Sequence, residues 1–155
     1  MIFSAVLFSV SWICFLLLAN KKYFLDFSPT CYLGMIIGFL TDILTDSYPL
    51  WEYDAGSDMQ EFLIETLDEF GVYFVTIYLF LQTLPKMQTV WTMTRHIFLW
   101  SLYSIALEWV AIKTGYMKHG LWWSLGCSYL SDWLLFISFY LHHKMRDKYL
   151  ANRSC

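Results

Sequence analysis

Charge is the scarcest property of this chain. Only 15% of its 155 residues are Asp, Glu, Lys or Arg, whereas a soluble domain has about 25%. The net charge is −3, and no basic patch or nucleic-acid motif is present, which argues against a nucleic-acid partner. The HExxH, GxSxG, P-loop and dinucleotide-binding patterns are all missing from the sequence. We therefore find no recognisable catalytic motif, lean towards a chain that is not an enzyme, and expect no cofactor.

Cysteine is also sparse. The four cysteines are Cys14, Cys31, Cys127 and Cys155, and none of them forms a CxxC pair or another metal-binding spacing. The first three fall in apolar runs, and the fourth is terminal. We interpret them as small packing residues and predict no metal site.

Apolar residues are what the chain has in excess. They make up 58% of it, aromatic residues alone make up 21%, and they lie in long runs without strand-type alternation. Runs of this length are typical of helices that cross a bilayer. We therefore predict a single all-α membrane domain over residues 1–155, a polytopic bundle of about five transmembrane helices. The expected helices are 2–19, 29–47, 65–84, 96–112 and 121–141, followed by a basic cytoplasmic tail, 142–155.

The first apolar run has two readings. It carries no charge before Lys21 and Lys22, and it is long enough to cross a bilayer. A signal peptide would begin with basic residues and end in small ones, and this run has only Ala19 at a suitable place. We favour a first helix that is retained in the mature protein.

The positions of Lys and Arg predict the orientation of the bundle. Eight of the ten fall beside one set of helix ends, and only Lys113 and Lys118 fall beside the other. Because basic residues concentrate in cytoplasmic loops, we expect the N-terminus outside and the C-terminus in the cytoplasm. The expected location is the cell (plasma) membrane.

Three carboxylates lie inside expected spans, namely Asp42, Glu108 and Asp132. Each would cost about 2.5–3.5 kcal/mol at a helix centre if it were charged and unpaired. Each shares a helix face with small or hydroxyl residues, such as Ser104 beside Glu108 and Ser128 beside Asp132. We expect these faces to meet in a polar pocket in the outer leaflet. The alternative is that the carboxyls only hydrogen-bond the helices together.

Residues near the expected membrane boundaries complete the predicted site. Lys113 and His119 lie in the loop after Glu108, where they can balance its charge. Trp51, Trp122 and Trp123 fall at span ends and are expected to anchor the interface. In the second span, Gly34 and Gly38 form a GxxxG pair that predicts close approach of another helix backbone.

An acidic stripe precedes the third span. Glu61, Glu65 and Asp68 recur at helical spacing, with Glu69 beside them. One interpretation is a solvated helix start, which the helix dipole favours. The other is a mouth that collects cations.

Several of these pieces together resemble a family of small, uncharacterised multi-pass membrane proteins of spore-forming Bacillota, chiefly Bacillus. The pieces are the Asn20–Lys22 sequence after the first helix, the helix exit Asp42–Tyr53, the Glu108–Trp109 pair, Gly120–Ser124 and Leu141–Lys144. The resemblance implies membrane location and topology, and it implies no activity. Asp132 departs from the family pattern, where an apolar or small residue is expected, which moves the weight of the prediction to Asp42 and Glu108.

Three functional hypotheses follow. The first is a membrane binding or assembly component, with membrane lipids as partners and with a second copy or another membrane protein as a further one. The second is a subunit of a proton- or cation-coupled transporter, which would need an oligomer because five helices are few for a carrier. The third is a lipid- or isoprenoid-modifying enzyme that uses intramembrane acids as general acid and base.

Overall fold

The computed structural model describes residues 2–153, and helices dominate it. The helices are α1 (Ile2–Leu18), η1 (Lys21–Tyr23), α2 (Phe24–Ser47), α3 (Asp58–Leu67), η2 (Asp68–Tyr73), α4 (Phe74–Gln82), α5 (Val90–Lys113) and α6 (Leu125–Arg153). Two short strands, β1 (Trp51–Tyr53) and β2 (Met117–His119), pair with each other. Because α3, the π-helical η2 and α4 follow one another without a break, they form one continuous helix. The all-α class is confirmed, and so is the expected number of long helices.

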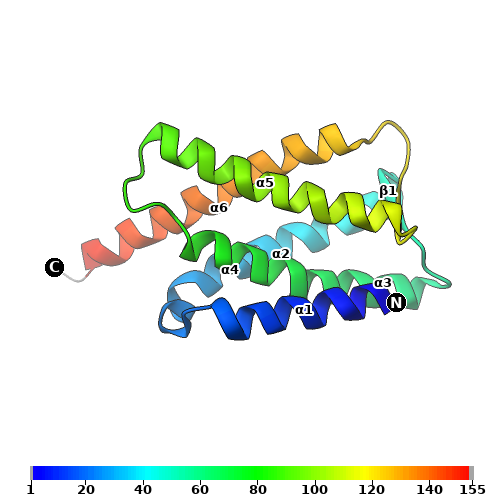
Figure 1. Ribbon diagram of the computed structural model, residues 1–155, viewed down its shortest axis with the longest axis horizontal. Coiled ribbons are helices and arrows are strands. Elements are labelled where there is room, and N and C mark those ends of the chain that lie inside the picture. The colour runs from blue at the N-terminus through cyan, green and yellow to red at the C-terminus, as the bar shows by residue number, and fades with distance from the viewer. Residues whose placement is uncertain (1, 154–155) are drawn as a thin grey trace.

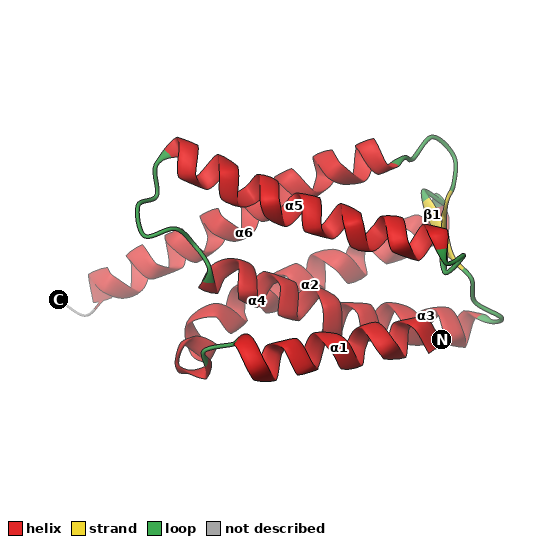
Figure 2. Cartoon of the chain, in the orientation of Figure 1, coloured by secondary structure: helices red, strands yellow, loops and turns green. Residues whose placement is uncertain are grey.

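The long helices run alternately in opposite directions between two ends of the molecule (Figures 1 and 2). The end that holds the N-terminus and the two strands is called the sheet end here. The opposite end holds η1, the link between α4 and α5, and the C-terminal part of α6, and it is called the tail end. Short connections between neighbouring antiparallel helices are typical of an up-and-down bundle. The fold therefore separates the two groups of basic residues that the sequence distinguishes.

The first helix is an integral part of this bundle. The Trp12 ring stacks on Phe74, with ring centroids 6.0 Å apart, and the Phe15 ring meets Tyr78 edge-on at 4.9 Å. The end of α1 is closed by hydrogen bonds, because Gln82 donates to the Leu18 carbonyl over 2.9 Å. Tyr78, which is fully buried, donates its hydroxyl to a carbonyl just beyond α1. These contacts make α1 part of the core of the bundle.

Helix α2 begins earlier than expected, at Phe24 rather than at Pro29. A proline has no N–H group, so within a helix it leaves the carbonyl four residues earlier without its usual donor. That carbonyl belongs to Leu25, and Arg146 of α6 donates to it over 3.4 Å and also to the neighbouring Asp26 carbonyl. The interaction ties the tail end of α6 to the start of α2.

Three further helix boundaries differ from the prediction. Helix α3 begins at Asp58, because its acidic first turns are favourable at a helix N-terminus. Helix α5 begins at Val90, where Thr89 and Thr92 form a capping box. Helix α6 begins at Leu125 and continues to Arg153, so the basic tail is helical over most of its length. Hydropathy marks apolar stretches and misses polar turns that continue a helix.

The two loops at the sheet end pair with each other, which the sequence does not predict. Trp51 of β1 lies opposite His119 of β2 in an antiparallel register. In the next pair, the Lys118 ammonium lies 2.7 Å from the Glu52 carboxylate. The Gly120 N–H then donates to the Leu50 carbonyl over 2.8 Å. This pairing brings β2 over the end of the bundle and positions His119.

Gly34 and Gly38 lie where the third long helix packs closely on α2, as the GxxxG pair predicts. A Cβ atom on Gly34 would overlap the Ile77 side chain of α4, and one on Gly38 would overlap the Glu69 carboxyl of η2. The space that these glycines leave is therefore filled by side chains from the third long helix. In particular, Gly38 makes room for a buried carboxyl.

One helical stretch of the described residues, Lys21–Ser47, is long and apolar enough to cross a membrane by length and composition. Close to half of its apolar window is buried in the bundle. Helix α1 is apolar but shorter. The multi-pass arrangement expected from the sequence therefore stays a prediction.

Candidate functional site

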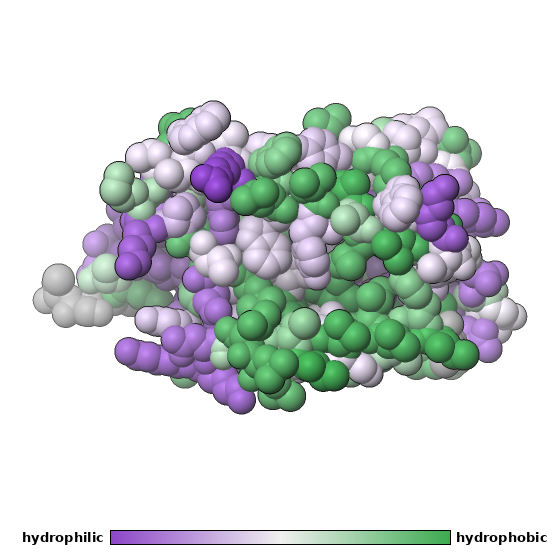
Figure 3. Space-filling model, viewed as in Figure 1, coloured by the Kyte–Doolittle hydropathy of each residue, from purple (hydrophilic) through white to green (hydrophobic). Residues whose placement is uncertain are grey.

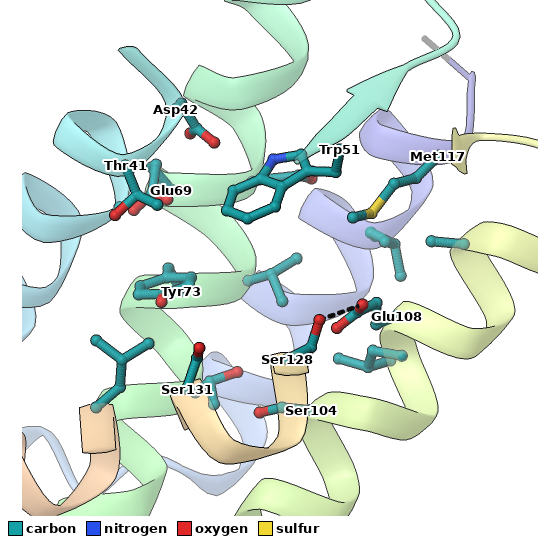
Figure 4. A pocket seen from close by; sticks show the side chains of 18 of the residues that line it. Thr41, Asp42, Trp51, Glu69, Tyr73, Ser104, Glu108, Met117, Ser128 and Ser131 are labelled. Atoms are coloured by element: carbon teal, nitrogen blue, oxygen red, sulfur yellow. Dashed lines mark hydrogen bonds between the residues drawn. The ribbon is translucent and has the colours of Figure 1, made fainter. Parts of the chain in front are cut away.

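A cavity of about 480 Å³ lies inside the bundle near the sheet end. The residues that line it come from α1, α2, η2, α4, α5, α6 and the strands or their flanks. Along α6 the lining extends from Ser128 to Phe139, a distance of about 16 Å at the rise of a helix. Its polar lining residues include Thr41, Asp42, Asp68, Glu69, Tyr73, Ser104, Glu108, Ser128 and Ser131 (Figure 4).

One wall of the cavity carries three carboxyl groups. Asp42 projects from α2, while Asp68 and Glu69 project from the π-helical η2. Asp68 accepts a hydrogen bond of 3.0 Å from the Tyr116 hydroxyl. Glu69 is only 4% exposed, and its Oε2 has no hydrogen-bond partner. A buried carboxyl oxygen without a donor is costly, so this wall holds unused acceptor capacity.

The opposite wall holds a satisfied carboxylate. Glu108 Oε1 accepts a hydrogen bond of 2.6 Å from the Ser128 hydroxyl, and His119 Nε2 lies 2.6 Å from the same oxygen. The Trp123 indole N–H in turn donates to Ser128 Oγ over 2.8 Å. Three segments, α5, β2 and α6, therefore meet at one carboxylate, and Trp123 in the turn before α6 joins them through Ser128. In Figure 4 this group faces Asp42 and Glu69 across the cavity.

The structure brings together two of the three carboxylates predicted from the sequence. Asp42 and Glu108 both line the cavity, on opposite walls. Asp132 is not among the lining residues, although it is close enough to Glu108 for the two like charges to repel each other. Its Oδ2 is buried and has no hydrogen-bond partner. One helical turn separates Asp132 from Ser128, and a side chain at position 132 lies beside the cavity rather than in it.

Of the two predicted partners of Glu108, only His119 contacts its carboxylate. Lys113 is exposed, and its ammonium lies over the Trp109 ring at 5.9 Å. His119 reaches Glu108 because the strand pairing holds the His119 side chain over the cavity. Lys113 is the last residue of α5, and its side chain extends away from the cavity.

The predicted interface tryptophans divide in the same way. Trp51 and Trp123 line the cavity, with their ring centroids 5.5 Å apart. Trp122 is 61% exposed, and its indole N–H donates to the Tyr48 hydroxyl. Two of the three rings therefore cover the sheet end of the cavity, and only Trp122 has the exposure of an anchor.

The most buried carboxyl of the site is Glu69, which belongs to the acidic stripe and not to the three carboxylates predicted for the pocket. The acidic stripe divides where the helix widens into η2, so that Asp68 and Glu69 face the cavity and the earlier acids do not. A solvated helix start is therefore wrong for Glu69. The signal that identifies it is a polar line of Glu69, Tyr73 and Thr76 at helical spacing, all of which line the cavity.

The remaining acids of the stripe form a separate cluster at the surface. The carboxylates of Asp46, Glu61 and Glu65 each have an oxygen within 4.8 Å of the others, which is close enough for one metal ion. It is the one such group among residues 2–153. Partial burial and the like charges of Asp46 and Asp58 raise the pKa of Glu61 above its ordinary value of 4.5. The cluster therefore opposes folding when it is fully ionised.

We expect Glu61→Gln to stabilise the protein by about 0.5–1 kcal/mol at pH 7, because it removes like-charge pairs at i−3 and i+4. Glu61 has a higher pKa when folded than when unfolded, so the wild type gains stability as the pH falls through the raised pKa towards 4.5. Denaturant unfolding at several pH values should show a smaller gain in the variant. Asp54→Asn, at an exposed position outside the cluster, is the control. An equal pH dependence in wild type and Glu61→Gln would contradict this account.

Of the described cysteines, Cys31 is a buried packing residue as predicted, whereas Cys14 and Cys127 are half-buried. Cys14, Cys31 and Cys127 are free thiols, and Cys31 is fully buried in the core. Cys155 lies outside the described residues.

Comparison of the chain with family models, with curated proteins and with solved structures finds no match. The resemblance to the Bacillota family therefore stays a prediction, and the function has to be argued from the cavity itself.

Proposed function

We propose that this protein is a multi-pass membrane protein that binds one amphipathic molecule in its internal cavity. The first support is the surface. Large apolar side chains on all the long helices are about half exposed or more, among them Leu16, Ile36, Phe62, Leu99 and Leu134. Figure 3 shows apolar residues across the middle of the visible face and polar residues towards both ends. A soluble monomer rarely exposes apolar surface so widely.

The second support is the distribution of charge. The tail end carries Lys21, Lys22 and Lys86, together with the basic turns of α6. The sheet end carries acids and only two lysines, one of which is paired with Glu52. Basic residues favour the cytoplasmic side, so the proposal places the tail end in the cytoplasm. The sheet end and the mouth of the cavity then face outward, at the plasma membrane.

The cavity itself carries the binding proposal. Its volume of about 480 Å³ lies within the range of about 300–1,000 Å³ that holds small ligands. The sheet end of the lining is polar, with Asp42, Glu69 and Glu108, whereas the far end is apolar, with Phe136 and Phe139. A molecule with a polar head and a single alkyl chain matches both parts. Lipids of the surrounding bilayer are the natural source of such a molecule.

Native mass spectrometry tests this proposal on the full chain released from a mild detergent. The protein is incubated separately with dodecylamine, dodecanol and lauric acid, which share one chain length. We expect a defined one-to-one adduct with at least one probe. Ser131→Phe, which fills the cavity from α6, should abolish the adduct. Ser138→Phe is the matched control, because Ser138 is exposed on the same helix and does not line the cavity.

Two results would contradict the binding proposal. One is the absence of a defined adduct with all three probes. The other is equal adduct formation by wild type and Ser131→Phe, because binding would then occur outside the cavity.

A second candidate function, cation- or proton-coupled transport, has one specific observation in its favour. Both Glu69 and Asp132 present buried carboxyl oxygens without partners, as the carboxyls of a proton relay do. Proton flux into vesicles that contain the protein should then fall in Asp132→Asn. Equal flux in vesicles with wild type, with the variant and with no protein would remove this candidate.

A further inference from the structure

We propose that the head of the bound amphiphile is a protonated amine that sits between Glu69 and Asp42. This inference rests on the proposed function and specifies the ligand class. The carrying observation is Glu69 Oε2, which belongs to a side chain only 4% exposed, lines the cavity and has no hydrogen-bond donor. Asp42, 7% exposed, projects into the same part of the cavity from α2 (Figure 4).

The charges of the cavity select a cationic head. The lining includes four carboxyl groups and no Lys or Arg from the described residues. His119 serves Glu108 on the opposite wall, and Tyr116 serves Asp68. Asp42, Asp68 and Glu65 are like charges that act on Glu69, so an anionic head would add to an existing repulsion. A cation removes that repulsion, because a buried charge needs a partner of opposite sign.

The spacing of the acids favours an organic cation over a metal ion. Within residues 2–153, the one group of carboxylates close enough to share a metal is the surface cluster of Asp46, Glu61 and Glu65. The cavity acids stand further apart, on α2, η2 and α5. An ammonium group has three N–H donors that point in different directions, so it can serve Glu69, Asp42 and a neighbouring hydroxyl such as that of Tyr73.

Gly38 supports the same placement from the other side. A side chain at position 38 would overlap the Glu69 carboxyl, so glycine leaves that carboxyl its place against α2. Apolar residues continue from this point along the cavity, with Ile77 on α4 and Phe139 on α6. An alkyl chain attached to the amine therefore extends in the direction of the apolar lining.

Competition between the three probes tests the headgroup. Equal concentrations of dodecylamine, dodecanol and lauric acid are offered together, and the bound compounds are quantified after isolation of the protein. Retention by Ser131→Phe is subtracted as background. We expect wild type to hold dodecylamine at least about tenfold more than either competitor, because hydrogen bonds to charged groups are the strong ones. Glu69→Gln should reduce that preference to about threefold or less.

Two further variants keep the test decisive. Gly38→Ala displaces the Glu69 carboxyl without removing it and should also reduce the preference for the amine. Asp132→Asn removes a buried carboxyl that does not line the cavity, and it should leave the preference unchanged. Equal retention of the three probes by wild type, or an unchanged preference in Glu69→Gln, would overturn the amine assignment. Binding of any probe would still support the proposed function, whereas binding of none would contradict that function itself.

Discussion

Replacement of Glu108 by alanine is expected to cost about 2–4 kcal/mol of stability, because His119 of β2 and Ser128 of α6 lose their common partner. The Ser128 hydroxyl and His119 Nε2 each lie 2.6 Å from one Glu108 oxygen, and the Glu108 and His119 side chains are both only 17% exposed. Without the carboxylate, the Ser128 O–H donor and His119 Nε2 lose their partner while they stay largely buried. The free energy of unfolding in mild detergent, followed by tryptophan fluorescence, measures the loss.

The strand pair contains a matched control for this prediction. Glu52 binds Lys118, the residue beside His119, but the two side chains are 46% and 73% exposed. An exposed ion pair contributes less than about 1 kcal/mol, so Glu52→Ala should have a small effect. Equal losses in Glu108→Ala and Glu52→Ala would contradict the view that Glu108 joins the sheet to the bundle.

Replacement of Gly71 by alanine is the second change with a large expected effect. An added Cβ would lie 2.7 Å from Phe8 Cδ2 and 3.1 Å from Phe8 Cα. The ring can rotate, but the backbone of α1 has to move away from η2. Overpacking of this kind costs about 1–3 kcal/mol. Thermal unfolding of the full chain should therefore show a clearly lower midpoint for Gly71→Ala.

Gly126→Ala is the control for this change. Gly126 is also helical, and an added Cβ there would have Ser124 Oγ at 3.7 Å as its nearest neighbour, which is ordinary contact. Alanine favours helix more than glycine does, so its stability should be unchanged or slightly higher. An undisturbed Gly71→Ala protein would mean that α1 does not pack on η2. In that case α1 would not be part of the core of the bundle.

The sequence predicts the long helices well and their ends poorly. Long apolar runs identify the five helical segments because burial of apolar surface, in a core or in lipid, dominates their energetics. The start of α5 at Val90 depends on a local hydrogen bond between two threonines. The pairing of Trp51 with His119 depends on residues 68 positions apart in the chain, and three-residue strands carry too little pattern to predict it.

The candidate site was predictable to a similar extent. The cost of a carboxylate within an apolar run correctly singled out Asp42 and Glu108 as cavity residues. The same argument included Asp132, which lies one turn from Ser128 on α6. Helical spacing alone does not show that the cavity includes Ser128 and Ser131 but stops short of Asp132. Glu69 was identified only as part of the acidic stripe, because its burial in the cavity depends on the π-helical widening at η2. Such widenings are common at functional sites.

The central claim is that this bundle crosses a membrane with its sheet end outside. Labelling of single cysteines with a membrane-impermeant maleimide in intact cells tests it most directly, in a chain whose four native cysteines are replaced by alanine. Asp54→Cys and Lys118→Cys at the sheet end should react from outside. Lys86→Cys and Lys148→Cys at the tail end should react only after the membrane is opened. Equal labelling at both ends in intact cells, or labelling of the tail end alone, would contradict the account.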